Sequence, residues 1–127
     1  MARDHRQLRV FQEAHELILA IYRETWNFPR DEWFGMRAQL RRAAVSIPSN
    51  IVEGSARRGI REYGNFLNMS RGSAAEVAYL VRLASELGYL SPTASELLQG
   101  RCDQLIPQLE SLIQKVDLLR RAERERP

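Results

Sequence analysis

The stretch RRAAVSIPSNIVEG, residues 41–54, decides the fold, because it keeps the apolar spacing of a helix across residues that a helix interior disfavours. Its apolar positions continue at three- and four-residue steps through Ile47 and Ile51. Pro48 removes a backbone hydrogen bond from that pattern. The unchanged spacing predicts one helix over about 31–56 with a kink at Pro48, and two shorter helices that break at Ile47 are the alternative.

The small and polar residues of the same stretch allow two interpretations. In the structural one, small residues such as Gly54 let a neighbouring helix approach, and Ser46 or Asn50 satisfies the carbonyls that Pro48 frees. In the functional one, Asn50 and Glu53 form a polar pocket that faces a partner. We favour the structural interpretation.

Three more amphipathic patterns flank this segment and predict helices over about 8–27, 60–87 and 92–121. Asp31 is expected to cap the helix over 31–56, Gly88 to end the third, and Ser91 followed by Pro92 to begin the fourth. The side chains that these spacings turn inward include the following: Leu8, Phe11, Ala14, His15, Ile18, Ile21, Tyr22, Trp26, Phe34, Leu87, Leu97 and Leu119.

No segment shows the alternation of a strand, so the sequence predicts an all-α fold. Four long helices with short connections predict a single domain over 1–127 that forms an antiparallel up-down-up-down four-helix bundle. The stretch from Ser70 to Glu76 places Gly72 and Ser73 among other small residues inside the third helix. Close packing of Gly72 against another helix is the expected reason.

The composition excludes several classes of protein. With 44% hydrophobic and 28% charged residues over 127 positions, the chain is globular and not disordered. Its one cysteine, Cys102, makes neither an internal disulfide nor a cysteine-rich zinc site. No apolar run reaches the roughly 18 residues that span a bilayer, and the charged first residues do not resemble a signal peptide. We therefore expect a cytoplasmic protein without membrane contact.

Catalytic and metal-binding patterns are missing from the sequence. Neither histidine follows a glutamate at the Glu-x-x-His spacing of di-metal bundles. His15 is expected to be partly buried on its helix, and Cys102 to be a small buried hydrophobe. There is no glycine-rich phosphate loop. We expect no catalytic residue, no metal and no cofactor.

Positive charge is concentrated in the middle of the chain. Residues 37–71 carry seven Arg against two Glu, a net +5, whereas residues 12–36 and 72–114 each carry −3. Such clusters bind phosphates, although a merely solvated face is the alternative. Arg41 and Arg42 have a further alternative, which is to pair with Glu53 or Glu76 inside the bundle. The candidate nucleic-acid-binding residues are Arg37, Arg41, Arg42, Arg57, Arg58 and Arg61, with the tail at Arg120 and Arg121 in support.

These residues resemble a family. The string from Arg41 to Gly54, together with Phe28-Pro29, Gly72-Ser73 and residues 87–90, is similar to the bacterial four-helix bundle proteins also called 23S rRNA intervening-sequence proteins, and to the accessory variability protein of diversity-generating retroelements. The resemblance implies a ring-shaped homopentamer without established catalytic activity or cofactor; its retroelement members bind a reverse transcriptase. The family motif residues, expected to be mainly structural, are Ser46, Pro48, Asn50, Glu53, Gly54, Gly72, Ser73 and Glu76.

The leading hypothesis is a non-catalytic oligomeric adaptor that binds RNA, DNA or a nucleic-acid enzyme through arginines. A protein–protein interaction module without nucleic-acid contact is the alternative, and an enzyme that uses the Asn50 and Glu53 pocket is a distant third. A surplus of aromatic residues predicts a lateral face that associates with other copies. Those residues are Trp26, Phe28, Trp33, Phe34 and Tyr63.

Overall fold

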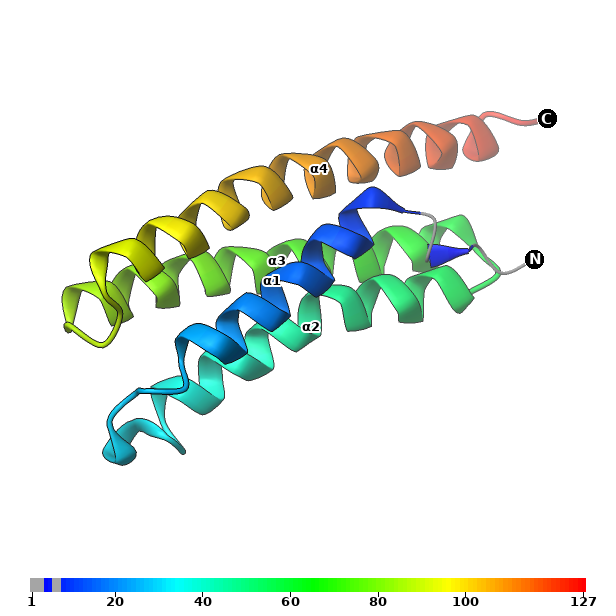
Figure 1. Ribbon diagram of the computed structural model, residues 1–127. Helices are drawn as coiled ribbons and strands as arrows, with labels where there is room; N and C mark the ends of the chain where they lie inside the picture. The colour runs from blue at the N-terminus through cyan, green and yellow to red at the C-terminus, as the bar shows by residue number, and fades with distance from the viewer. Residues whose placement is uncertain (1–3, 6–7) are drawn as a thin grey trace.

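The computed structural model describes residues 4–5 and 8–127 of the chain. Four α-helices make up most of this part, and it contains no strand (Figure 1). The helices are α1 (Arg9–Glu24), α2 (Met36–Ala56), α3 (Ile60–Glu86) and α4 (Pro92–Arg124), and a short 3-10 turn, η2 (Arg30–Glu32), precedes α2. The all-α, four-helix prediction is confirmed.

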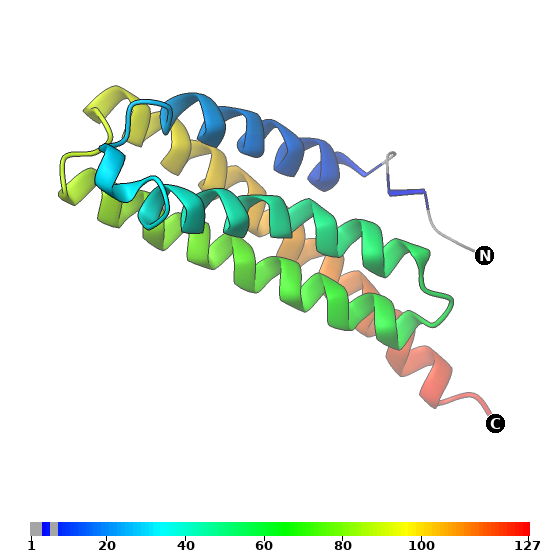
Figure 2. The same cartoon turned by 90° about the horizontal axis from the view of Figure 1, so that it is seen from below.

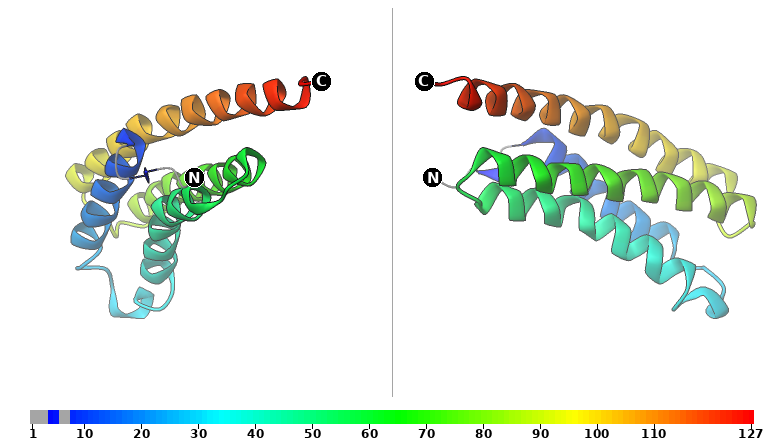
Figure 3. Two further views of the ribbon diagram at one scale, coloured as in Figure 1. Left: turned by 90° about the vertical axis from the view of Figure 1, so that its right-hand side faces the viewer. Right: turned by 180° about the vertical axis from the view of Figure 1, so that it is seen from behind.

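The helices pack in chain order around one core. α1 packs on α2, α2 on α3 and α3 on α4, and α4 returns to pack on α1. Consecutive helices run in opposite directions, so the α1–α2 and α3–α4 connections lie at one end of the bundle (Figure 2). The two connections touch there, since the Tyr89 hydroxyl donates to the Glu32 carboxylate at 3.0 Å and the rings of Phe28 and Tyr89 lie 5.6 Å apart. The α2–α3 connection and the C-terminal turns of α4 lie at the other end (Figure 3).

Local signals set most helix boundaries. Gly88, with φ 80°, follows the end of α3 in the left-handed conformation that glycine tolerates. The Ser91 hydroxyl accepts from the Ala94 amide at 3.1 Å and caps α4, as predicted. Asp31 does not cap the second helix, because α2 begins only at Met36. Glu32 takes that role, accepting from the Met36 amide at 3.2 Å.

α2 runs unbroken across Pro48, so the alternative of two shorter helices is wrong. The hydrogen bonds expected from Ser46 or Asn50 to the carbonyl that Pro48 frees are not the ones that the structure shows. Pro48 frees the carbonyl of Ala44, but the Asn50 amide donates to the Ser46 carbonyl at 2.8 Å and to the Ser46 hydroxyl at 3.0 Å. The Ser46 hydroxyl also bonds to the Ser73 hydroxyl of α3 at 2.8 Å. These groups link α2 to α3 because side chains at 46 and 50 share the α3-facing side of the helix.

The core is aliphatic, and the side of α1 that it takes overlaps only in part with the predicted one. Val10, Leu17 and Ala20 are buried with Ala14 and Ile21. Of the predicted stripe, Ala14 and Ile21 lie in the core, and Leu8, Phe11 and Ile18 are partly buried against it. The residues predicted inward that are exposed are His15, Tyr22, Trp26, Phe34, Leu87, Leu97 and Leu119.

Two glycines predicted to allow close packing behave differently. A Cβ on Gly54 would lie 2.8 Å from the Phe66 Cβ and 3.0 Å from the Tyr63 Cδ1, so this glycine does let α3 approach α2. A Cβ on Gly72 would meet nothing within 4 Å, so the close packing predicted there is wrong. Ser70 and Ala74 are the buried positions, and Gly72, two residues from either, faces the opposite side of the helix.

Candidate functional site

The six candidate arginines do not form one patch. Arg37, Arg41 and Arg42 lie in the first turns of α2, while Arg57, Arg58 and Arg61 lie at its far end and in the first turn of α3. With 21 residues, α2 is about 30 Å long. Because this length separates the two groups, each group is a separate candidate surface.

Arg41 fastens α2 to α1. Its Nε donates to the Thr25 hydroxyl at 3.0 Å, its Nη2 donates to the Tyr22 carbonyl at 3.1 Å, and its guanidinium lies 4.3 Å from the centre of the Tyr22 ring. Burial and the neighbouring Arg37 charge lower the pKa of Arg41. The alternative of a carboxylate partner inside the bundle is therefore wrong for Arg41, and its role is structural.

Arg37 and Arg42 remain available for a partner. The Arg37 guanidinium lies 4.4 Å from the Trp33 ring centre, and Arg42 is exposed. Neither forms an ion pair within the described residues, so the pairing of Arg42 with Glu53 or Glu76 is also wrong. Glu76 instead accepts from the Gln39 side-chain amide at 3.4 Å.

Of the second group, Arg57 is partly neutralised. Its guanidinium nitrogens lie 3.4 Å from a Glu53 oxygen and 3.8 Å from a Glu62 oxygen, and its charge sits 5.1 Å from the Phe66 ring centre. Arg58 and Arg61 are exposed and lack an ion pair among the residues that the structure describes. These two are the better candidates for phosphate contacts.

The C-terminal turns of α4 add arginines to this end of the bundle. Two adjoining hollows, of about 290 and 380 Å³, share the side chains of Ile60 and Glu123. We call the arginines that line them the basic end: Arg58, Arg61, Arg120, Arg124 and Arg126. Glu123 is the only carboxylate in the lining described. Arg121, the other tail residue predicted in support, is exposed but lines neither hollow.

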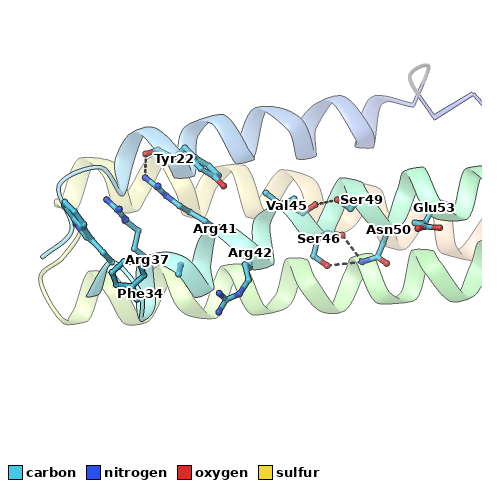
Figure 4. Close-up of a pocket in the computed structure, with 12 residues that line it drawn as sticks. Tyr22, Phe34, Arg37, Arg41, Arg42, Val45, Ser46, Ser49, Asn50 and Glu53 are labelled. Atoms are coloured by element: carbon cyan, nitrogen blue, oxygen red, sulfur yellow. Dashed lines mark hydrogen bonds between the residues drawn. The ribbon is translucent and has the colours of Figure 1, made fainter. Parts of the chain in front are cut away.

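A groove of about 750 Å³ follows the outer face of α2 (Figure 4). Tyr22 and Phe34 border one end of it, and Asn50 and Glu53 lie toward the other. Ser46 lies between these ends, and Ser46 and Asn50 use their polar groups in bonds within α2 and to α3. The groove thus combines an aromatic end that carries arginines with a far end lined by Asn50 and Glu53, where Asn50 bonds to Ser46 and Glu53 pairs with Arg57.

The remaining chemical groups offer little reactivity. Burial raises the pKa of the Cys102 thiol to about 11, so this buried side chain stays protonated near neutral pH. His15 is exposed, contrary to the partial burial predicted for it. Over the described ranges, no three metal-ligating side chains gather. None of the helices in this part of the chain is long and apolar enough to cross a membrane.

Comparison with known proteins identifies relatives. Residues 6–111 match the model of a family described as 23S rRNA-intervening sequence protein. A crystal structure from Bacteroides thetaiotaomicron, of a protein with unknown function from the S23 ribosomal protein family, is similar with a TM-score of 0.76 and 23% identity. The match covers 83% of this chain and 95% of that one, and it establishes the same fold. No curated protein matches the chain.

Proposed function

The chain belongs to the 23S rRNA-intervening sequence protein family, and from that premise we propose that it is a non-catalytic, oligomeric accessory protein whose basic end binds nucleic-acid phosphates. The observation that carries the proposal is the convergence of two distant segments. Arg58 and Arg61 follow α2, whereas Arg120 and Arg124 come from the end of α4 and Arg126 from the residues after it. Five guanidinium groups around two hollows, with one carboxylate among them, suit a polyanion.

Binding of this kind is insensitive to base sequence. Guanidinium groups on the solvent side of helix ends reach phosphate oxygens, which are the same at every nucleotide. A symmetric oligomer repeats the basic end once per subunit, so that a long RNA or DNA contacts several copies at once. The same surface could also bind a nucleic-acid enzyme, such as a reverse transcriptase, by contacting the phosphates of the RNA or DNA that the enzyme holds.

The test is the salt dependence of RNA binding by the full chain. We expect log affinity to fall linearly with log salt, at about −0.7 per phosphate contact for single strands. Replacing Arg58, Arg61 and Arg124 together by alanine should weaken binding to all sequences alike and flatten the slope by about 2 if each arginine makes one contact.

The matched control removes three positive charges elsewhere. Arg23, Arg71 and Lys115 are exposed, lie on three different helices and line neither hollow. Their triple alanine variant should keep the slope of the parent. If both variants weakened RNA binding equally, the loss would follow from net charge alone, and the assignment of binding to the basic end would be overturned.

A module that binds only proteins is the second candidate. The observation in its favour is the exposure of two large aromatic side chains: Phe34, which lines the α2 groove, is 94% exposed, and Trp26, in the α1–α2 connection, is 73% exposed. If the parent protein binds neither RNA nor DNA at low salt, the nucleic-acid proposal fails and this second function replaces it.

A further inference from the structure

Phe34 is an exposed aromatic ring near two arginines that form no ion pair within the described residues. It is 94% exposed in the short segment between η2 and α2, where it borders the α2 groove. Arg37 and Arg42 follow on the first turns of α2 and line the same groove. We call these three side chains the Phe34 knob. A phenyl ring left in water beside two guanidinium groups without carboxylates is typical of a surface that is covered by an anionic partner.

A hollow with the opposite charge lies at the same end of the bundle. It has a volume of about 840 Å³ and is formed around the α3–α4 connection and the first turns of α4. Leu90 and Pro92 give it apolar lining, and Glu96 and Asp103 are exposed carboxylates within it. Neither carboxylate forms an ion pair in the described part of the chain. Gly100 also lines the hollow, and a Cβ there would meet nothing within 4 Å, so the hollow is open at that point.

The knob and the hollow lie at the same end of the bundle axis but on different sides of the molecule. They share this end because the Tyr89–Glu32 hydrogen bond joins the α1–α2 and α3–α4 connections, beside which the knob and the hollow lie. The sides differ because α2, which carries the arginines, packs on α1 and α3 and makes no comparable contact with α4. A second copy standing beside the first, with its ends aligned, therefore meets a hollow with its knob.

We propose that the Phe34 knob of one copy inserts into the α3–α4 hollow of a second copy, with Arg37 and Arg42 opposite Glu96 and Asp103. The contact joins two different surfaces, so an open chain of copies keeps a free knob at one end and a free hollow at the other until a ring closes. The inference deepens the oligomeric part of the proposed function and rests on it. The basic end, at the other end of the bundle, takes no part in the contact.

The first experiment is a charge swap on the full chain, read by size-exclusion chromatography with light scattering at micromolar concentration. Arg37→Glu with Arg42→Glu should turn the oligomer into monomers, and Glu96→Arg with Asp103→Arg should do the same. The chain that carries all four changes should assemble again, because the reversed knob meets a reversed hollow. As a control, Arg71→Glu with Lys115→Glu reverses two exposed charges outside both surfaces and should leave the mass unchanged.

The second experiment separates assembly from folding. Gly100→Leu fills the hollow without a clash inside the subunit, so it should abolish assembly while the melting temperature of the monomer rises. Gly72→Leu is matched, since Gly72 also lies inside a helix with open space at its Cβ and is outside both surfaces. It should raise the melting temperature and keep the oligomer intact.

The outcomes distinguish the two proposals. A parent protein that is monomeric at these concentrations overturns both the oligomer and this contact. An oligomer that survives the charge reversals and Gly100→Leu overturns the contact alone, and so does failure of the four-residue swap to restore assembly. RNA binding is measured separately and does not enter either result.

Discussion

At the scale of single residues, three helical glycines show how packing decides the effect of one missing side chain. Gly54 lies where α3 approaches α2, and an added Cβ would be 2.8 Å from the Phe66 Cβ. Gly72 and Gly100 lie on open helix surfaces with nothing within 4 Å of a Cβ. A glycine inside a helix costs about 0.5–1 kcal/mol relative to alanine, so the two open glycines weaken the isolated subunit.

The first prediction compares alanine at Gly54 and Gly72. Gly72→Ala should raise the free energy of unfolding by about 0.5–1 kcal/mol, because it adds helix propensity without a contact. Gly54→Ala should lower that free energy by about 1–3 kcal/mol, because α2 and α3 must separate to admit the methyl group. Urea denaturation measures the free energy of unfolding of both variants. If Gly54→Ala raised that free energy, α2 and α3 would have to move apart at little cost, and the expected clash would be contradicted.

At the scale of the elements, α1 and α2 are joined by polar contacts as well as by the core. Arg41 reaches from α2 to two groups at the C-terminal end of α1, the Thr25 hydroxyl and the Tyr22 carbonyl, and covers the Tyr22 ring. The buried Thr25 hydroxyl also donates to the Ile21 carbonyl at 2.7 Å. The C-terminal end of α1 is thus bonded to α2 through Arg41, at the start of the α1–α2 connection.

The second prediction tests this link with two adjacent arginines. Arg41→Ala should lower the free energy of unfolding by about 1–3 kcal/mol, because two charge-assisted hydrogen bonds and a cation–π contact are lost. Arg42→Ala is the control and should change it by no more than about 0.5 kcal/mol, as expected for an exposed side chain without an intramolecular partner. Equal losses in chemical denaturation would contradict a clamping role for Arg41. The comparison is made at a concentration where both variants have the same mass.

At the scale of the whole molecule, the two proposed surfaces occupy opposite ends of the bundle. The Phe34 knob and its hollow lie with the α1–α2 and α3–α4 connections, and the basic end lies with the α2–α3 connection and the end of α4 (Figures 2 and 3). Assembly through the first end leaves the second exposed on every subunit. All basic ends then point the same way in a ring.

The third prediction follows from this separation. The Arg58, Arg61 and Arg124 alanine variant should lose RNA affinity and keep the mass of the parent oligomer. The Arg37→Glu, Arg42→Glu variant should become monomeric and lose affinity for long RNA by at least about tenfold, because several weak contacts no longer act together. Its affinity for an RNA short enough to contact one subunit should change little. Fluorescence anisotropy with a long and a short RNA measures both, and equal losses for the two lengths would place the reversed arginines in direct RNA contact.

The sequence by itself determined the class of fold and most of the local structure. Helical spacing, Gly88, Ser91 and Pro92 act through neighbours along the chain, so the number of helices and several of their ends follow without knowledge of packing. The role of Gly54 was also predictable, because it belongs to a run of small residues on the face that carries Ile47 and Ile51.

Only the tertiary structure decided which side chains share a surface. The six candidate arginines are close in sequence but form two separate groups, because the length of α2 lies between them. Arg58 and Arg61 line the same hollows as Arg124 and Arg126, because α4 ends at the same end of the bundle. Phe34 was wrongly placed because α2 begins only at Met36, so Phe34 precedes the helix that was expected to turn it inward. Gly72 was wrongly placed because small size alone does not show which side of a helix a residue occupies. The physical reason is that a surface is formed by contacts across the bundle, and those depend on where each helix ends and which neighbour it meets.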